Sequence, residues 1–265
     1  MEYGIIDFVG LSSKGLGKDA FSFKLKKEDI SFMEIKSEIF GKKSLPFFKA
    51  NIDKLKEFYS LKDIRRLDKY ARIVLLLSSE ILKNINQNEK EDMAVILGTS
   101  YGSFKTNCDF LDTIILQGFE YASPMLFTGT VHNSPLAPLG IFQGLRGTSY
   151  CISNFEKTFS SSLYLADLLL SSMVCEKILL IFADEISDLL LYGFSNILKI
   201  DEDNIRTIPQ EGGCAFLLGF ENFILPLKKI NDFLKERQKN MENYGFTYYP
   251  EAFELLINLN KIDIK

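Results

Sequence analysis

The sequence is poor in the side chains on which many catalytic and metal sites depend. Its 265 residues include one histidine, His132, and no tryptophan. A mechanism that needs two imidazoles is therefore excluded unless a second chain supplies one. No CxxC pair and no cluster of cysteine with histidine occurs, so neither a structural zinc site nor another metal or cofactor is expected. The four cysteines are Cys108, Cys151, Cys175 and Cys214.

Long hydrophobic runs and a strong positive charge are also missing. The longest apolar runs, such as Ile178–Ala183, are too short to span a bilayer. The first residues lack the basic region and apolar core of a signal peptide, so a cytoplasmic protein with reduced thiols is expected. A net charge of −4 argues against nucleic-acid binding. The lysine-rich residues 24–57 predict a β-ribbon or loop whose lysines form either a solvated face or a basic patch for an acidic carrier protein.

Short apolar strands alternate with amphipathic helices along most of the chain. This alternation predicts an α/β layer with a largely buried, partly parallel sheet. Two further helices are expected at 226–240 and 250–258. The expected strands are Tyr3–Val9, Met93–Leu97, Thr148–Ile152, Ile178–Ala183 and Cys214–Phe220, and the expected helices are Ile64–Ile85, Ser103–Leu116 and Phe159–Ser171.

The second expected strand runs into Gly98-Thr99-Ser100-Tyr101-Gly102. This is the G-x-S-x-G pattern of the nucleophile elbow in α/β-hydrolases, which makes Ser100 a candidate nucleophile for an acyl hydrolase. The histidine of such a site would have to be His132, about thirty residues later, which leaves little room for the intervening strands. The alternative is structural, because small residues let the chain turn tightly as it leaves a strand.

Several motifs together resemble the N-terminal half of β-ketoacyl synthases, the condensing enzymes with the thiolase fold. The match is closest to short synthase-like proteins found with fatty-acid and aryl-polyene gene sets, and it spans roughly residues 3–220. It implies a thiolase-like α/β fold with a mixed, mostly parallel sheet and flanking helices, as one domain over residues 1–220 with a helical extension, 221–265, packed on it. The motifs are Arg65–Lys69, Met93–Ser103, Ser123-Pro124 with Phe127, Val131–Asn133, Gly147-Thr148 and Gly212–Leu218.

The resemblance also locates the position of the family's nucleophilic cysteine. That cysteine lies nine residues after the first glycine of the Gly147-Thr148 motif and ten before an alanine of the next helix, and both counts reach Glu156. A carboxylate cannot form the acyl thioester of a condensing enzyme, so no catalytic residue is expected. Cys151 lies five residues too early. The family's catalytic histidines belong to a C-terminal half, and the position of His132 matches neither of them.

A condensing-enzyme fold without its nucleophile is similar to the chain-length factors, inactive subunits that pair with an active synthase. The resemblance implies a heterodimer with such a synthase, or a homodimer, and contact with an acyl carrier protein. Nucleic acid is not expected as a partner. Loops near Leu111–Met125 and the residues Phe127, His132 and Asn133 would then wall the partner's acyl tunnel. The strand expected to pair across the interface comprises Thr148, Ser149, Tyr150, Cys151, Ile152 and Ser153.

Overall fold

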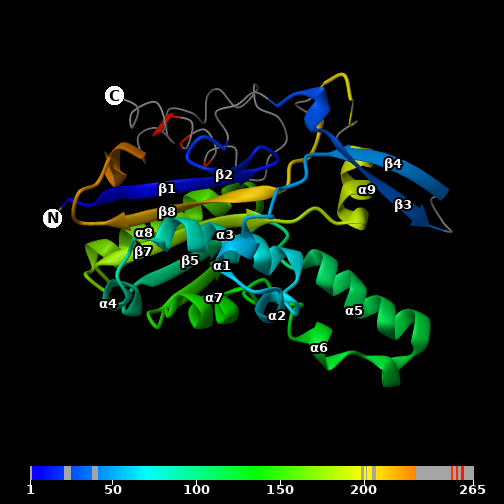
Figure 1. The fold of residues 1–265 in the computed structure, drawn as a ribbon, viewed down its shortest axis with the longest axis horizontal. Coiled ribbons are helices and arrows are strands. Elements are labelled where there is room, and N and C mark those ends of the chain that lie inside the picture. The colour runs from blue at the N-terminus through cyan, green and yellow to red at the C-terminus, as the bar shows by residue number, and fades with distance from the viewer. Residues whose placement is uncertain are drawn as a thin grey trace.

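The computed structural model describes residues 2–20, 25–37, 41–197, 200, 202–204, 207–230, 252, 255, 258 and 259. Seven of the strands it describes form one sheet in the order β2-β1-β8-β7-β5-β6, with β9 paired to β1 (Figure 1). The bounds are β1 Gly4–Ser12, β2 Gly15–Gly17, β5 Ala94–Gly98, β6 Ser149–Ile152, β7 Lys177–Asp184, β8 Gly212–Gly219 and β9 Leu225–Pro226.

The sheet is mixed, as the sequence predicts. Strand β5 pairs in parallel with both β6 and β7. In contrast, β8 pairs antiparallel with β7 and with β1. The expectation of a mostly parallel sheet therefore holds only for the half of the sheet that contains β6, β5 and β7. There the connection from β6 to β7 is helix α8 (Thr158–Ser171), and a helical crossover of this kind is what parallel strands require.

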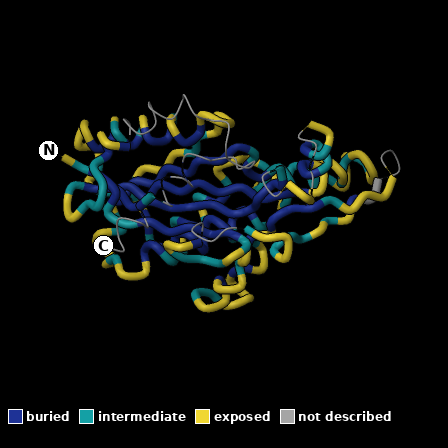
Figure 2. The backbone as a smooth tube through the Cα atoms, turned by 90° about the horizontal axis from the view of Figure 1, so that it is seen from above, coloured by how far each residue is buried: buried dark blue, intermediate teal, exposed yellow. Residues whose placement is uncertain are grey.

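Helices cover both faces of the sheet. Helix α3 (Lys69–Leu82) packs on one face together with α7 (Leu136–Gln143), and α8 packs on the other. Successive side chains of a strand point to opposite faces, so Leu179 and Ile181 join the α3 core while Leu180 and Phe182 join the α8 core. Figure 2 shows this buried backbone as a dark blue central band with exposed segments around it.

Helix α3 starts later than the helix expected at 64–85. The Asp68 carboxylate accepts a hydrogen bond from the Ala71 amide at 2.7 Å and caps the helix, which satisfies one of its free N–H groups. The residues before the cap form the separate short helix α2 (Leu61–Ile64). The charged residues 65–68 thus separate α2 from α3, and no single helix runs through them.

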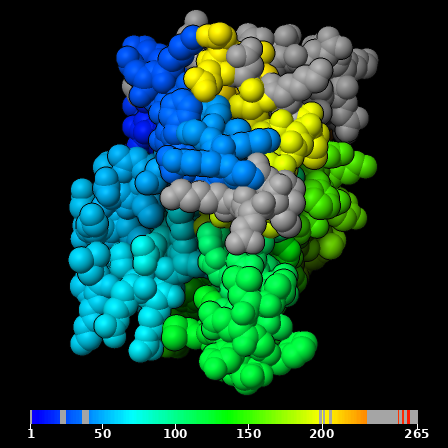
Figure 3. Space-filling view, turned by 90° about the vertical axis from the view of Figure 1, so that its right-hand side faces the viewer, coloured from blue at the N-terminus to red at the C-terminus, as the bar shows by residue number. Residues whose placement is uncertain are grey.

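Two excursions leave the layered body (Figures 1 and 3). Strands β3 (Ser31–Ser37) and β4 (Gly41–Phe47) form an antiparallel hairpin beside α9 (Asp188–Ile197), which confirms the expected β-ribbon. Helices α5 (Phe104–Gln117) and α6 (Pro124–Phe127) project below the hairpin and are green in Figure 3. The remaining short helices are η1 Lys27–Asp29, α1 Leu55–Phe58, α4 Gln87–Glu91, η2 Phe119–Tyr121 and η3 Phe155–Lys157.

Most of the two helices expected at 226–240 and 250–258 lies outside the described residues. Three residues of this part, Ala252, Leu255 and Leu259, are buried in the same core as Phe8 and Phe216. The predicted division at residue 220 stays a prediction. Among the residues that the structure describes, no helix is long and apolar enough to cross a membrane.

Candidate functional site

The turn after β5 is closed by a carboxylate from the same chain. Asp184, the last residue of β7, is 2% exposed. Its carboxylate accepts hydrogen bonds from the Thr99 hydroxyl at 2.7 Å and from the amides of Ser100, Tyr101 and Gly102 at 3.0, 2.9 and 3.2 Å. Three successive amides that point at one anion form a nest, and here an internal side chain fills it.

This arrangement gives the hydrolase alternative no support. Ser100 is 4% exposed, and its hydroxyl donates to the Phe155 carbonyl at 3.4 Å. Within the described part of the chain, Ser100 makes no hydrogen bond to His132. Amides that could stabilise an oxyanion in a nucleophile elbow bind Asp184 instead. The small residues of this motif therefore fit the structural alternative, a tight turn that the Asp184 carboxylate stabilises by hydrogen bonds.

His132 is exposed, and its imidazole packs on Gly102 of that turn. Gly102 has φ +54°, and a Cβ built on it would lie 2.0 Å from the imidazole Nδ1. The Tyr70 hydroxyl donates to the His132 carbonyl at 3.2 Å and so fixes the loop to helix α3. Asn133 is exposed beside it. Glycine is needed at position 102 for two reasons, the left-handed backbone and the ring that packs on it.

Glu156 lies in η3, immediately before α8, and its side chain is exposed. The preceding residue, Phe155, has φ +44° and packs edge-on against Tyr101 with ring centroids 6.0 Å apart. Burial raises the pKa of Tyr101, and the nearby carboxylates of Asp184 and Glu156 raise it further. Glu156 thus lies beside the turn, where the resemblance expects the nucleophile.

Cys151 lies in strand β6, away from that position. Burial raises the pKa of its thiol to about 11, with a further contribution from Asp184. Since only a thiolate is a good nucleophile, a thiol with this pKa is unreactive at neutral pH.

Strand β6 is the last strand of the sheet, and no strand lies beside its outer edge within the part of the chain that the structure describes. The two helices that precede and follow β6 in the chain, α7 and α8, carry exposed apolar side chains. We call the "β6 edge surface" the exposed residues Ile141 of α7, Ser149 and Tyr150 of β6, and Tyr164 and Leu168 of α8. An exposed strand edge with apolar flanks is a site at which another chain can continue the sheet.

A second apolar surface lies on the projecting helices. Helix α5 buries only one of its 14 residues, Thr106. Isolated apolar side chains on a surface need no explanation, but a contiguous group of them marks an interaction site. The "α5–α6 surface" consists of the exposed residues Leu111, Ile115, Leu116, Phe119, Tyr121, Met125, Phe127 and Val131.

Comparison with known proteins identifies the fold and the family. The profile of the β-ketoacyl synthase N-terminal domain matches residues 54–195, which is more than half of the chain. The chain belongs to the β-ketoacyl synthase family. The matched part of this family member includes the turn after β5, the β6 strand and Glu156. No curated protein matches the sequence.

Solved ketosynthase structures share the fold. The ishigamide ketosynthase/chain length factor is 16% identical with a TM-score of 0.64, over 83% of this chain and 63% of that one. A ketosynthase in complex with its chain length factor from Xenorhabdus doucetiae is 20% identical with a TM-score of 0.56, over 83% and 79%. An AntDE:AntF complex of a ketosynthase with its acyl-carrier protein is 11% identical with a TM-score of 0.65, over 98% and 82%. These matches confirm the thiolase-like α/β fold, and the chain spans less than two thirds of the first of them.

This family member also has a group of charged side chains around the end of β7, Glu185, Glu211 and Lys69. The sequence alone does not predict that these residues meet. Glu185 follows Asp184, is 4% exposed, and its Oε1 atom has no hydrogen-bond partner among the described residues. Burial raises its pKa to about 8, and the negative charges of Asp68 and Glu211 add to the effect. The only signal in the sequence is the pair of acids that closes an apolar strand.

Glu211 is the fully buried partner in this group. It accepts hydrogen bonds from the amides of Ala50 and Ile186 at 3.1 Å, and its carboxylate pairs with the Lys69 ammonium at 2.6 Å. The pair joins the start of β8 to the first turn of α3 and to the segment after β7. A buried charge with such partners is satisfied, and it differs in this respect from Glu185.

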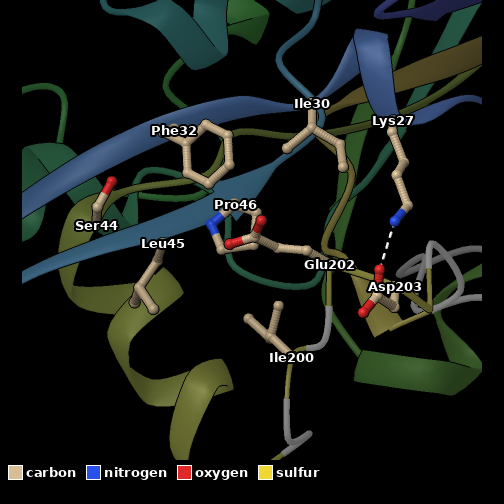
Figure 4. Close-up of a pocket in the computed structure, with 9 residues that line it drawn as sticks. All are labelled: Lys27, Ile30, Phe32, Ser44, Leu45, Pro46, Ile200, Glu202 and Asp203. Carbon is tan, nitrogen blue, oxygen red and sulfur yellow. Dashed lines mark hydrogen bonds and ion pairs between the residues drawn. The ribbon is translucent and has the colours of Figure 1, made fainter.

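A groove of about 600 Å³ lies between the β3–β4 hairpin and residues Ile200, Glu202 and Asp203 (Figure 4). Its walls include Phe32, Leu45 and Ile200, and it contains none of the predicted site residues. Acids pair with several lysines in and near this region, and whether its lysines form a solvated face or a basic patch stays a prediction. The pairs are Lys14–Asp29, Lys26–Glu28, Lys27–Asp203 and Lys42–Glu34.

Proposed function

We propose that this chain is a non-catalytic partner subunit, similar to a chain-length factor, of an active β-ketoacyl synthase. The pair would act on acyl chains bound to a carrier protein in fatty-acid or polyketide biosynthesis of the aryl-polyene type. Two of the similar solved structures contain a ketosynthase with a chain length factor, and a third contains a ketosynthase with an acyl-carrier protein.

The observation that carries this proposal is Glu156. This residue, in η3 immediately before α8, carries a carboxylate, and it is exposed beside the turn after β5. Condensation by this family needs a thiolate that accepts the acyl group, and a carboxylate does not form that thioester. Cys151 does not replace it, since its raised pKa keeps the thiol protonated at neutral pH.

The β6 edge surface supports pairing with a second subunit. The backbone of Ser149–Ile152 pairs with no strand on one side among the described residues, and α7 and α8, which precede and follow this strand in the chain, carry exposed apolar side chains. A partner strand would satisfy the edge and cover these side chains together. The α5–α6 surface and the exposed residues His132 and Asn133 would then lie against the partner and wall its acyl tunnel.

Co-expression with a cognate β-ketoacyl synthase tests the proposal. We expect the two chains to co-purify as a heterodimer, shown by native mass measurement, and the synthase to make acyl products only in its presence. The variant Leu168→Lys, on the β6 edge surface, should abolish co-purification, whereas Leu61→Lys, an exposed leucine of α2, should not. A chain that forms only homodimers, or no complex with any cognate synthase, contradicts the proposal.

The variant Glu156→Gln tests whether this subunit takes part in the condensation reaction. If the subunit is non-catalytic, this change should leave product formation by the heterodimer within about twofold, because the group takes no part in bond formation. The serine variant Ser100→Ala should be equally without effect on hydrolysis of acyl thioesters. A loss of activity by two orders of magnitude in either variant would show that the chain itself carries chemistry.

A further inference from the structure

Two large apolar residues of this chain have a backbone conformation that disfavours any side chain. In the part of the chain that the structure describes, three non-glycine residues have a left-handed φ: Phe155 at +44°, Met173 at +54° and Asn222 at +53°. Asparagine is among the residues that tolerate this region, so Asn222 is an ordinary case. Phenylalanine and methionine are not, and Phe155 and Met173 are 60% and 57% exposed. Strained backbone therefore presents an apolar side chain to solvent at both positions.

Met173 occupies a position after a helix at which glycine is usual. Its amide donates to the Leu170 carbonyl at 3.0 Å. The next amide, that of Val174, donates to the Leu169 carbonyl at 3.0 Å. This is the Schellman motif at the end of α8, and its left-handed residue is most often glycine because glycine has no Cβ. Glycine would make the same hydrogen bond without strain, so the helix end itself does not require methionine.

Phe155 lies in the turn that joins β6 to α8. Its carbonyl accepts the Ser100 hydroxyl at 3.4 Å, a hydrogen bond that needs no particular side chain. One edge of the ring packs against Tyr101, and this contact leaves the residue more than half exposed. Strained backbone persists where the surrounding structure or the function of a site maintains it. A poorly covered aromatic ring on a left-handed residue therefore points to a binding role.

These two residues lie at opposite ends of the edge strand β6. Phe155 comes three positions after the last residue of β6. Met173 lines a cavity of about 630 Å³ together with Gly147 and Thr148, which come directly before β6. Helix α8 connects the two residues, and its 14 residues extend for about 21 Å. The α8 residues of the β6 edge surface lie between them along the helix, so apolar groups are exposed at both ends of the edge strand.

We propose that Phe155 and Met173 are preorganised anchors with which the β6 edge surface binds the β-ketoacyl synthase subunit. The inference deepens the proposed function and rests on it. A partner that continues the sheet at β6 would cover both ends of that strand, whereas a small ligand cannot span the length of α8. Aromatic side chains and methionine are enriched in such interfaces, and a few of them contribute most of the binding energy. A side chain that the backbone already presents loses less conformational entropy on association.

Glycine at each position separates binding from folding, because it removes the strain and the side chain together. We expect Met173→Gly to raise the midpoint of thermal unfolding by up to about 4 °C, since the relief of strain exceeds the entropy that glycine adds to the unfolded chain. In Phe155→Gly the relief offsets the loss of the Tyr101 contact, and the midpoint should stay within about 2 °C.

Both glycine variants should nevertheless bind the synthase at least about tenfold more weakly than the wild type, as measured by native mass over a dilution series of the co-expressed complex. Asn222→Gly is the matched control, because it relieves a left-handed residue in the turn between β8 and β9, away from β6. Its affinity should equal that of the wild type. Met173→Leu keeps an apolar side chain and should recover most of the affinity that Met173→Gly loses.

Glycine variants that bind the synthase as tightly as the wild type would overturn the anchors and leave the proposed function intact. A fall of more than about 5 °C in the thermal midpoint of Met173→Gly would also overturn them, because it would show that this side chain supports the fold. A wild-type chain that pairs with no cognate synthase would remove the proposed function. Self-association that both glycine variants abolish would then make a second copy of the chain, and not a synthase, the occupant.

Discussion

At the scale of single residues, Asp184 combines four hydrogen bonds in one buried carboxylate. An asparagine at this position keeps the size of the side chain but loses the charge and one of the two acceptor oxygens. Because hydrogen bonds to charged groups contribute more than neutral ones, we expect Asp184→Asn to lower the free energy of unfolding by about 2–4 kcal/mol. Urea denaturation measures this change. Asp112→Asn, at an exposed carboxylate of α5, should change stability by less than about 0.5 kcal/mol.

Glu185 makes stability depend on pH in a direction that its raised pKa fixes. The folded-state pKa, about 8, lies above the ordinary 4.5, so the folded protein retains a proton that the unfolded chain has lost. Its contribution is complete below pH 4.5 and is lost as the pH rises through 8. The wild-type free energy of unfolding should therefore fall, relative to Glu185→Gln, by at most about 1.4 kcal/mol per pH unit in this window. Parallel pH profiles of the two proteins would contradict this prediction.

A comparison of Glu156 with Asp184 and Glu185 shows which kinds of site residue can be predicted from a sequence. Counting along the chain from Gly147 and Ala166 predicts that Glu156 occupies the nucleophile position, because the spacing of a motif is a property of the sequence itself. The roles of Asp184 and Glu185 depend on which elements meet at the end of β7: the turn after β5, the start of α3 and the first turn of α5. Only the folded chain brings these segments together, so no local pattern could distinguish the two neighbouring acids.

At the scale of elements, the turn after β5 requires glycine at position 102. Gly102→Ala places a Cβ in a left-handed conformation and against the imidazole of His132. We expect a loss of about 1–2 kcal/mol from the backbone alone. His132 is the only histidine, so its NMR ring signals are single and directly report the displacement of the ring.

Gly193 offers the matched control for this substitution. A Cβ built on it meets nothing within 4 Å, and it lies inside helix α9. Gly193→Ala should raise stability by up to about 1 kcal/mol, because alanine favours a helix, and it should leave the His132 signals in place. Unchanged histidine signals in Gly102→Ala would contradict the packing of the ring on the turn.

Periodicity located most elements, and local contacts decided their boundaries. The strands expected near residues 93–97, 148–152 and 178–183 correspond to β5, β6 and β7, and the helices expected at 103–116 and 159–171 correspond to α5 and α8. The start of α3 was missed because the cap at Asp68 competes with a longer helical pattern. The antiparallel placement of β8 between β1 and β7 was also missed, since an apolar strand buried on both faces carries no mark of its direction.

At the scale of the whole molecule, the buried core and the exposed apolar surfaces have separate tasks. The core between α3, the sheet and α8 accounts for the fold, and Ile115, Leu116 and Phe119 contribute nothing to it, being 73%, 76% and 83% exposed. Replacing all three by lysine should change the free energy of unfolding by no more than about 0.5 kcal/mol for each residue. The same triple variant should no longer co-purify with the synthase, because it would bury three charges in the interface.

A second triple variant controls for the added charge. Phe32→Lys, Leu61→Lys and Ile197→Lys introduce the same three charges at residues that are 53%, 67% and 78% exposed and lie outside both apolar surfaces. This control variant should be as stable as the wild-type protein and should still co-purify with the synthase, since the partner is not expected to contact these side chains. Comparison of the two variants by thermal unfolding and by pull-down assigns the α5–α6 surface to binding only if folding is unaffected in both. A triple α5–α6 variant that still pairs with wild-type affinity would show that the partner contacts the β6 edge surface without it.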